Sequence, residues 1–433
     1  MPRARRGGKA ATQARGGESW SAGTAGARGE RAEARTASDG AVGAPPARPR
    51  VAHITSADMS LRYLLLNQMR GLQQAGYAVT GISAPGPDVP AIEAAGIRHI
   101  PIPITRRLTP WADLVALWRL ARVLRRERFA IIHTHTPKAG LLGQYAAVLA
   151  RVPIRVHTIH GLYFPSHMKS WHRWAYVLLE RLTMRFSHMN LSQSAEDIPV
   201  AVSERICDPE RVRLLGNGID LASFDPGAQS PERRAATRAA LALSGEHKVV
   251  GMVARFVAEK GYREMLRAAQ IIKRVSPEVR FLFVGPVEAD KRDAIDPRLI
   301  DELELSDVVR FLGHRTDTAD LYAVMDVVAL PSYREGFPRV PMEAAAMGVP
   351  AVVTDVRGCR QTVTHGVTGF RVPVRDAEAL AAALLDLLGD ADKRAAFGRA
   401  AREKAIAEFD ERVVVARVED AYRQLLGHRG TPV

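Results

Sequence analysis

The segment Tyr333–Met347 reads Tyr-Arg-Glu-Gly-Phe-Pro-Arg-Val-Pro-Met-Glu-Ala-Ala-Ala-Met and sets two glutamates around a glycine and two prolines. Pro338 and Pro341 lack an amide proton, so they fit the first turn of a helix and would damage its interior. We therefore predict that a helix begins near Pro338. Glu335 then lies in the loop before the helix, and Glu343 lies inside it. The free amides and the positive dipole end between the two carboxylates suit a phosphate group.

The two glutamates are eight positions apart, and Gly336-Phe337 directly follows the first. This pattern resembles the donor-binding signature of retaining glycosyltransferases of family 4, which have the GT-B fold. In that family the first glutamate contacts the donor sugar and the second contacts the ribose, so the resemblance implies these roles for Glu335 and Glu343. The alternative is an ordinary pair of surface carboxylates. Most family members have Gly or Ser where this chain has Pro338, which removes one amide donor.

A basic pair follows an expected strand in the sequence Arg255-Phe-Val-Ala-Glu-Lys260-Gly261. At a strand-to-helix turn, two such cations can converge on one anion. The pair is similar to the pyrophosphate-binding pair of family 4. The resemblance implies that Arg255 and Lys260 neutralise the diphosphate and stabilise charge on the departing nucleotide. Without the two glutamates downstream, solvated cations at a helix start would explain the same residues.

Further donor-side candidates lie where strands of the second half end. Gly285 ends one expected strand and permits close backbone approach, whereas His314 and Arg315 follow Gly313 at the end of the next strand, where family members commonly contact the base. Ligands of open parallel sheets bind beyond the carboxyl ends of the strands, which favours these positions. Ordinary turn chemistry is the alternative explanation for Gly285 and His314.

Histidines mark two strand ends of the first half, in Ile-Ile-His133-Thr-His135-Thr-Pro-Lys138 and in Val-His-Thr-Ile-His160-Gly. The rings of His133 and His135 project from the same side of a strand, but no further ligand stands at a recognisable metal-site spacing. We therefore expect no metal. In similar enzymes a histidine after the fifth strand faces the donor sugar across the cleft, and His160 is our candidate. His133 and His135 either line that cleft or form hydrogen bonds that stabilise the fold.

The first strand-to-helix turn lacks the Gly-Gly loop that many relatives carry there. Ser60 and Arg62 could supply equivalent contacts at the helix start, and Asp58 could orient an acceptor hydroxyl. Together with His133, His135 and Lys138, these residues form our candidate acceptor side.

Short apolar runs alternate with amphipathic helical stretches from residue 51 onward, which is the pattern of parallel βα units. We predict two Rossmann-like domains of an α/β GT-B fold facing a central cleft. With the roles that the resemblance to family 4 implies, the expected order is a disordered basic tail (1–50), an N-terminal acceptor domain (51–215), a linker (216–230), a nucleotide-sugar-binding domain (231–410) and, as in GT-B relatives, a helix that crosses back to the first domain (411–433). Expected strands cover 51–55, 78–83, 131–134, 154–158 and 189–192 in the first half, and 248–254, 280–284, 308–312, 327–330, 351–354 and 368–372 in the second. Expected helices include 63–74, 111–127, 171–185, 377–388, 393–408 and 412–426.

Composition limits the location of the chain. Its 433 residues favour two domains, and its two cysteines form neither a metal cluster nor a disulfide framework, which favours the cytoplasm. No apolar run reaches the ~18 residues that a spanning helix needs, and the first 50 residues lack a signal-peptide apolar region. Those 50 residues carry 10 Lys/Arg and 4 Asp/Glu, a net charge of +6 out of +14. They contain almost no large apolar side chains and should be disordered.

Aromatic and basic residues alternate in the segment Leu162–Trp174, just after His160. This composition suits the edge of a bilayer, and from it we expect a lipid-diphosphate-linked acceptor and peripheral contact with the anionic inner face of the cell membrane. The alternative is an ordinary core helix with Trp171 and Trp174 packed inside.

These patterns lead to one functional expectation. By its resemblance, the chain is a retaining glycosyltransferase that transfers a sugar from a nucleoside diphosphate donor, expected to be UDP-linked, to a hydroxyl of a glycan or lipid-linked precursor in polysaccharide biosynthesis. Relatives generally need no obligatory metal or cofactor, so EDTA should not abolish turnover. A GT-B sugar-nucleotide epimerase or phosphorylase is the nearest alternative. A nucleic-acid-associated protein is a remote one, because charge alone identifies no specific partner.

Overall fold

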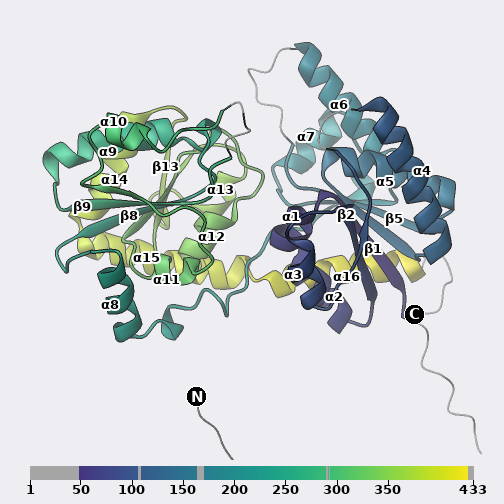
Figure 1. Cartoon of the computed structure of the whole chain (residues 1–433), viewed down its shortest axis with the longest axis horizontal. Coiled ribbons are helices and arrows are strands. Elements are labelled where there is room, and N and C mark those ends of the chain that lie inside the picture. Colours follow the sequence, from purple (N-terminus) through teal and green to yellow (C-terminus); the bar gives the residue numbers. More distant parts are fainter. Residues whose placement is uncertain (1–47, 106–108, 163–169, 289–290, 292, 428–433) are drawn as a thin grey trace, which may run out of the picture. The chain divides into compact units, whose positions relative to one another are not determined.

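The computed structural model describes residues 48–105, 109–162, 170–288, 291 and 293–427 (Figure 1). The tail expected over 1–50 falls mainly on residues outside this part of the chain. Within the described residues the chain forms two parallel β-sheets, each covered by helices. The predicted fold class, α/β with two Rossmann-like domains, is therefore confirmed.

The first sheet has the order β3-β2-β1-β4-β5-β6-β7, and all its described strand pairs are parallel. Its strands are β1 (Arg50–Ala57), β2 (Ala78–Ala84), β3 (Arg98–Pro101), β4 (Ile131–His135), β5 (Ile154–Ile159), β6 (Met189–Ser192) and β7 (Val212–Leu214). Alternate residues of a strand point to opposite faces. Val51 accordingly joins the apolar cluster under the helices Leu66–Gln74 and Glu411–Gly427, while Ala52 joins the cluster under the helices Pro110–Glu127 and Pro137–Ala150.

The helices of this half alternate with its strands. They are α1 (Asp58–Ser60), the π-helical η1 (Leu61–Leu65), α2 (Leu66–Gln74), α3 (Val89–Ala94), α4 (Pro110–Glu127), α5 (Pro137–Ala150), α6 (Ser170–Met184), α7 (Asp197–Ser203) and the 3₁₀ turn η2 (Pro209–Arg211). Pro110 and Pro137 occupy the first turns of α4 and α5, where a missing amide proton costs nothing.

The second sheet has the order β10-β9-β8-β11-β12-β13 and is also parallel. Its strands are β8 (Lys248–Val253), β9 (Val279–Val284), β10 (Val309–Phe311), β11 (Val327–Leu330), β12 (Ala351–Thr354) and β13 (Gly369–Val372). Its helices are η3 (Pro226–Ala228), α8 (Pro231–Ala240), η4 (Ala258–Lys260), α9 (Tyr262–Val275), α10 (Leu299–Glu302), α11 (Thr318–Tyr322), α12 (Arg339–Ala346), α13 (Cys359–Thr362), α14 (Ala377–Gly389) and α15 (Ala391–Glu408). Helices α9 and α14 cover one face, whereas α11 and α12 border the other.

The chain passes between the two sheets twice, and the two passages are hydrogen-bonded to each other. Ile219 donates its amide to the carbonyl of Phe409 over 2.9 Å, and Glu411 donates to the carbonyl of Ile219 over 3.1 Å. A Cβ on Gly218 would lie 2.6 Å from the Cα of Glu411, so only glycine allows this approach. The final helix, α16 (Glu411–Gly427), then packs against α2 and the first sheet.

The central strands lie within two residues of their predicted bounds, but β3 and β7 were missed. Both are edge strands with exposed side chains, so they lack an apolar run. The edge strands β10 and β13 of the second sheet have no exposed residues and were predicted. The helix predicted over 63–74 begins earlier, at Asp58. It starts as the short α-helix α1, continues as the π-helical η1 and becomes α-helical again at Leu66.

We expect Val418→Ala to destabilise the protein by about 2 kcal/mol, because it removes two methyl groups from a fully buried position of α16 on the first sheet. Val413→Ala is the matched control on the same helix, since Val413 is 41% exposed and its truncation should cost less than about 0.5 kcal/mol. Urea unfolding measures both variants. Equal midpoints would show that α16 adds little to the core of the first sheet.

Candidate active site

Lys260 and Glu335 form an ion pair beyond the ends of β8 and β11, although β9, β10 and β11 lie between them in the sequence. The Lys260 ammonium lies 2.7 Å from Oε1 of Glu335, and both side chains are largely buried. Ser332, which follows β11, donates its hydroxyl to the same carboxylate oxygen over 2.7 Å. Two donors therefore fix the Glu335 carboxylate at the carboxyl edge of the second sheet, where ligands of parallel sheets bind.

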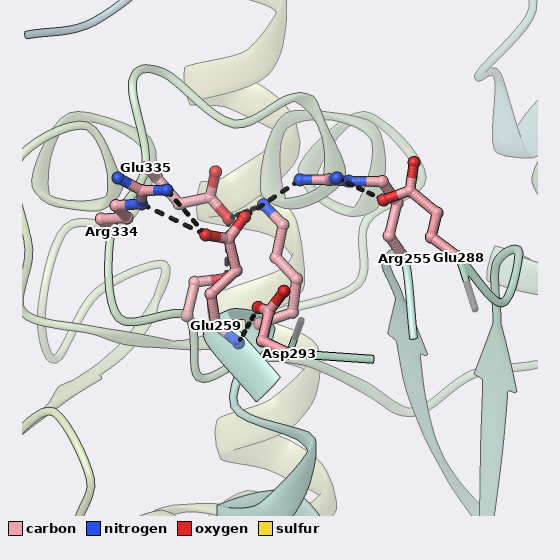
Figure 2. Close-up of polar contacts among 8 residues, drawn as sticks. Arg255, Glu259, Glu288, Asp293, Arg334 and Glu335 are labelled. Atoms are coloured by element: carbon pink, nitrogen blue, oxygen red, sulfur yellow. Dashed lines mark hydrogen bonds and ion pairs between the residues drawn. The ribbon is translucent and has the colours of Figure 1, made fainter. Parts of the chain in front are cut away.

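Arg255 lies beside this pair and contacts two further carboxylates (Figure 2). Its guanidinium donates to Glu288 over 2.6 Å and to Glu259 over 3.0 Å. Burial disfavours its charged form, but the bonds and charges of Glu288 and Glu259 raise the pKa of Arg255 above its ordinary value. Glu259 also accepts from Arg334, which links the two arginines through one carboxylate.

Glu343 occupies a more enclosed setting on α12. This helix begins at Arg339 with Pro338 as its N-cap residue, in agreement with the predicted start near Pro338. The Glu343 carboxylate accepts from the Tyr322 hydroxyl over 3.0 Å and lies 3.7 Å from the guanidinium of Arg339. Burial raises the pKa of Glu343 despite these partners, so this carboxylate is held closer to its neutral form than an exposed glutamate.

His160 meets the Glu335 loop through the backbone. A Cβ on Gly336 would lie 2.0 Å from the carbonyl oxygen of His160, so the two chain segments are in direct contact and leave no room for a side chain. On its other side, Nε2 of His160 lies 3.0 Å from Nδ1 of His135. The structure thus places the backbone of His160 against the Glu335 loop, while its imidazole is bonded to His135.

The remaining donor-side candidates have varied settings. The amide of Gly285 donates to the carbonyl of Gly313 over 2.8 Å, so the ends of β9 and β10 are joined. His314 is exposed and makes an edge contact with the ring of Tyr63, whereas Arg315 is paired with Asp317. The ring of Phe337 packs against Phe409, 6.1 Å between centroids, so it serves as an apolar anchor.

The acceptor-side candidates are not brought together as one group. Arg62 borders a pocket of about 210 Å³ that Tyr63, Gln193, Asn217 and Arg339 also line, and Ser60 is half-buried at the helix start. The carboxylate of Asp58 accepts from the backbone amide of Asp88.

Lys138 is buried and ion-paired with Asp113 of α4 at 2.5 Å, so its charge is compensated inside the fold. His133 and His135 are buried as well, and both form hydrogen bonds within the first domain and α16. His53 lies with them, so the structure supplies the third imidazole that the spacing of the sequence did not reveal.

Several residues of the site were missed by the sequence reasoning. Ser332 lies two residues beyond the end of β11, and this strand-end position could have revealed it. Glu259 lies between the two cations Arg255 and Lys260 in the quoted motif, but its pairing with Arg334 depends on the fold. Tyr322 is fully buried in a short helix and gives no sequence signal.

Comparison with known proteins identifies the class. Residues 233–404 match the family model described as glycosyl transferases group 1, and residues 62–218 match that of the glycosyl transferase 4-like domain. A D-inositol 3-phosphate glycosyltransferase from Saccharomonospora viridis is 32% identical over 374 residues, covering 79% of this chain and 83% of that protein. The chain belongs to the group 1 glycosyltransferases, and it is an enzyme of this class.

Two further relatives are similar over most of their length. The capsular polysaccharide biosynthesis glycosyltransferase CapM of Staphylococcus aureus is 27% identical, covering 87% of this chain and 97% of that protein. An Escherichia coli UDP-Gal:alpha-D-GlcNAc-diphosphoundecaprenol alpha-1,3-galactosyltransferase is 28% identical, covering 66% and 73%. Among solved structures, Anabaena HepE in complex with UDP and glucose superimposes with a TM-score of 0.76 at 22% identity, covering 87% of this chain and 100% of that one.

We expect Gly336→Ala to lower turnover about a hundredfold, because the added Cβ would displace Glu335 and His160 by an ångström or more. Gly389→Ala is the matched control, since a Cβ there meets nothing within 4 Å. Steady-state rates, with thermal unfolding as a check on folding, measure both variants. Wild-type turnover in Gly336→Ala would refute the close contact with His160.

Proposed function

We propose that the protein is a retaining glycosyltransferase that moves a sugar from a UDP-linked donor to a hydroxyl of a lipid-linked or polysaccharide precursor. The observation that carries this proposal is the buried Lys260–Glu335 ion pair, with Gly336 seated on the carbonyl of His160. This region offers a cation for a diphosphate and a carboxylate for sugar hydroxyls. The contact with the His160 carbonyl supports the choice of His160 as the group from the other domain.

The proposed reaction divides these groups by the charge that each one meets. The bond between the anomeric carbon and the diphosphate oxygen breaks, and Arg255 and Lys260 stabilise the negative charge that develops on the phosphate. The acceptor oxygen bonds to the anomeric carbon on the face that the diphosphate leaves, and its proton passes to the departing oxygen, so the configuration is retained. Glu335 and His160 orient the sugar, and Glu343 binds the ribose. This scheme uses no metal and no protein nucleophile.

Relatives support the choice of substrates. HepE was crystallised with UDP, and the E. coli relative is named for UDP-Gal and a diphosphoundecaprenol-linked acceptor. A Campylobacter jejuni relative, 26% identical over 323 residues, is likewise named for a diphospho-undecaprenol acceptor. A polyprenyl diphosphate of this kind resides in a bilayer, which an enzyme of this class must then approach.

An exposed aromatic surface on α4 and α6 supports such an approach. Trp111 and Trp118 of α4 are 84% and 61% exposed, and Trp171 and Trp174 of α6 are 64% and 65% exposed, so the alternative that the latter two form a core is wrong. Residues 163–169 of the quoted aromatic segment lie outside the described residues. Both helices pack on α5, as Figure 1 shows. In the described part of the chain, no helix has the length and apolar character needed to cross a membrane.

Basic residues continue the same stripe of α4. Trp111, Val115, Trp118, Arg122 and Arg125 recur at helical spacing and are exposed. Aromatic rings and cations side by side favour the interface of an anionic bilayer. We therefore assign the exposed aromatic surface to peripheral contact with anionic lipid.

Glu335→Gln and Lys260→Ala should each lower turnover at least tenfold without unfolding the protein, because each removes one member of the buried pair. The matched controls are Glu278→Gln and Lys248→Ala, a more exposed ion pair at the opposite end of β8, which should stay within twofold of wild type. UDP release from UDP-glucose, UDP-galactose and UDP-N-acetylglucosamine, with and without a lipid-linked acceptor, measures all four.

The same assay separates the alternatives. Release of UDP without acceptor, together with an altered sugar, would indicate the epimerase. Adding EDTA should leave the wild-type rate unchanged, and wild-type turnover in either site variant would remove that residue from the reaction.

Replacing Trp111 and Trp118 together by alanine should lower co-sedimentation with phosphatidylglycerol-containing vesicles at least threefold, because it removes the largest exposed apolar area of α4. Ile406→Ala/Val413→Ala is the control, since both side chains are exposed on other helices. Vesicle binding that is unchanged in the tryptophan variant, and that is lost when residues 1–47 are deleted, would contradict docking through the exposed aromatic surface.

A further inference from the structure

A chain of hydrogen-bonded imidazoles leads from His160 into the first domain. Nε2 of His160 lies 3.0 Å from Nδ1 of His135, and Nε2 of His135 lies 3.0 Å from Nδ1 of His53. The far nitrogen of His53 lies 3.5 Å from the hydroxyl of Tyr422 on α16. That hydroxyl lies 2.7 Å from Nδ1 of His133, whose Nε2 lies 2.6 Å from Oγ1 of Thr158.

All four histidines of this hydrogen-bonded series are neutral at pH 7. Burial lowers the pKa of His53 to about 3, and it lowers that of His160 to about 4 despite a hydrogen bond with the side chain of Gln193. Burial also holds the pKa values of His133 and His135 well below their ordinary range. A neutral imidazole has one N–H donor and one acceptor nitrogen. Each ring between two partners must therefore donate to one of them and accept from the other.

This requirement means that all the hydrogen bonds between His160 and Tyr422 must donate in the same direction. If His160 donates from Nε2, then His135 and His53 donate toward Tyr422, which donates to His133. If the hydroxyl of Tyr422 instead donates to His53, every bond between Tyr422 and His160 reverses. Nε2 of His160 is committed to one role by this chain, so Nδ1 takes the opposite role, as an acceptor in the first case and as an N–H donor in the second.

We propose that Tyr422 is a positioning residue for His160. Its hydroxyl joins His53 to His133, and the direction in which it donates sets every bond between Tyr422 and His160 and thereby the ring nitrogen of His160 that carries the proton. The inference rests on the proposed function, in which His160 orients the donor sugar. A sugar hydroxyl can donate or accept, but a defined tautomer of His160 selects one arrangement. Tyr422 of α16, the helix that follows the second domain, then sets the tautomer of His160 in the first domain.

A metal ion is the competing explanation for His53, His133 and His135, since one nitrogen of each lies within 4.8 Å of the others. The ring planes argue against it. His133 and His135 stack with centroids 4.3 Å apart and planes 26° apart, so their lone pairs run side by side and do not converge. Both nitrogens of His133 also have close oxygen partners, the hydroxyls of Tyr422 and Thr158.

Tyr422→Phe tests the proposal, because it removes the hydroxyl and keeps the ring. Tyr77→Phe is the matched control: Tyr77 is buried in the same cluster, its ring meets that of Tyr422 edge-on, and its hydroxyl lies outside the chain. The full-length protein, labelled with ¹⁵N-histidine, gives the tautomer of each ring by NMR, and the spectrum of His160→Gln assigns the His160 signals. The kcat with the UDP-sugar that supports transfer and the Kd for UDP complete the set.

We expect one defined His160 tautomer in wild type and in Tyr77→Phe, and a mixed or reversed one in Tyr422→Phe. The kcat of Tyr422→Phe should fall about tenfold, as for other partners that orient a functional imidazole, while the Kd for UDP stays within twofold. Unchanged His160 nitrogen shifts in Tyr422→Phe, or equal losses of kcat in the two tyrosine variants, would overturn the proposal. So would a stoichiometric metal in the purified protein that is lost in His53→Gln. Wild-type kcat in His160→Gln would instead refute the role of His160 in the proposed function, and the nitrogen shifts would still decide the hydrogen-bonded chain.

Discussion

The structure depends on the backbone pairing of the two passages between its sheets. Ile219 exchanges hydrogen bonds with Phe409 and Glu411, and the missing side chain of Gly218 lets the two strands of backbone touch. Because Glu411 is also the first residue of α16, this pairing fixes where that helix starts. The end of the chain is thereby delivered to the first sheet, where Val418 and Tyr422 complete the apolar cluster begun by Val51. The core of the first domain is therefore finished by residues that follow the second.

Close backbone contacts also hold the polar site in place. The Glu335–Gly336 loop rests against His160 on one side, and the loop at Gly358 comes within contact distance of the Gly336 carbonyl on another. A loop enclosed in this way cannot easily move its carboxylate, which Lys260 and Ser332 hold by side-chain bonds. Orientation is thus fixed by neighbours from three segments, and this preorganisation is what an electrostatic mechanism requires.

Much of this could be predicted from the sequence, and the exceptions have physical causes. Central strands such as β11 and β12 are buried on both faces, so their apolar runs reveal them. The edge strands β3 and β7 carry exposed polar residues and were missed. Pro338 revealed the start of α12 because a missing amide proton has a strictly local effect. The Tyr422–His133 bond joins residues 289 positions apart, and no local pattern could reveal it. The exposure of the tryptophans of α4 was not predicted. An amphipathic pattern shows which face of a helix is apolar, but it does not show whether another element packs on that face.

The two glutamates that opened the sequence argument illustrate how environment assigns different tasks to one residue type. Glu335 faces a lysine, so its charge is compensated where a sugar and a diphosphate are proposed to meet. Glu343 lies deeper beside Tyr322, and burial raises its pKa. In the proposed reaction, the enclosed carboxylate of Glu343 accepts hydrogen bonds from the neutral ribose hydroxyls. The eight-residue spacing is thus a means of placing one carboxylate before a helix start and another inside the helix, with a different local dielectric at each position.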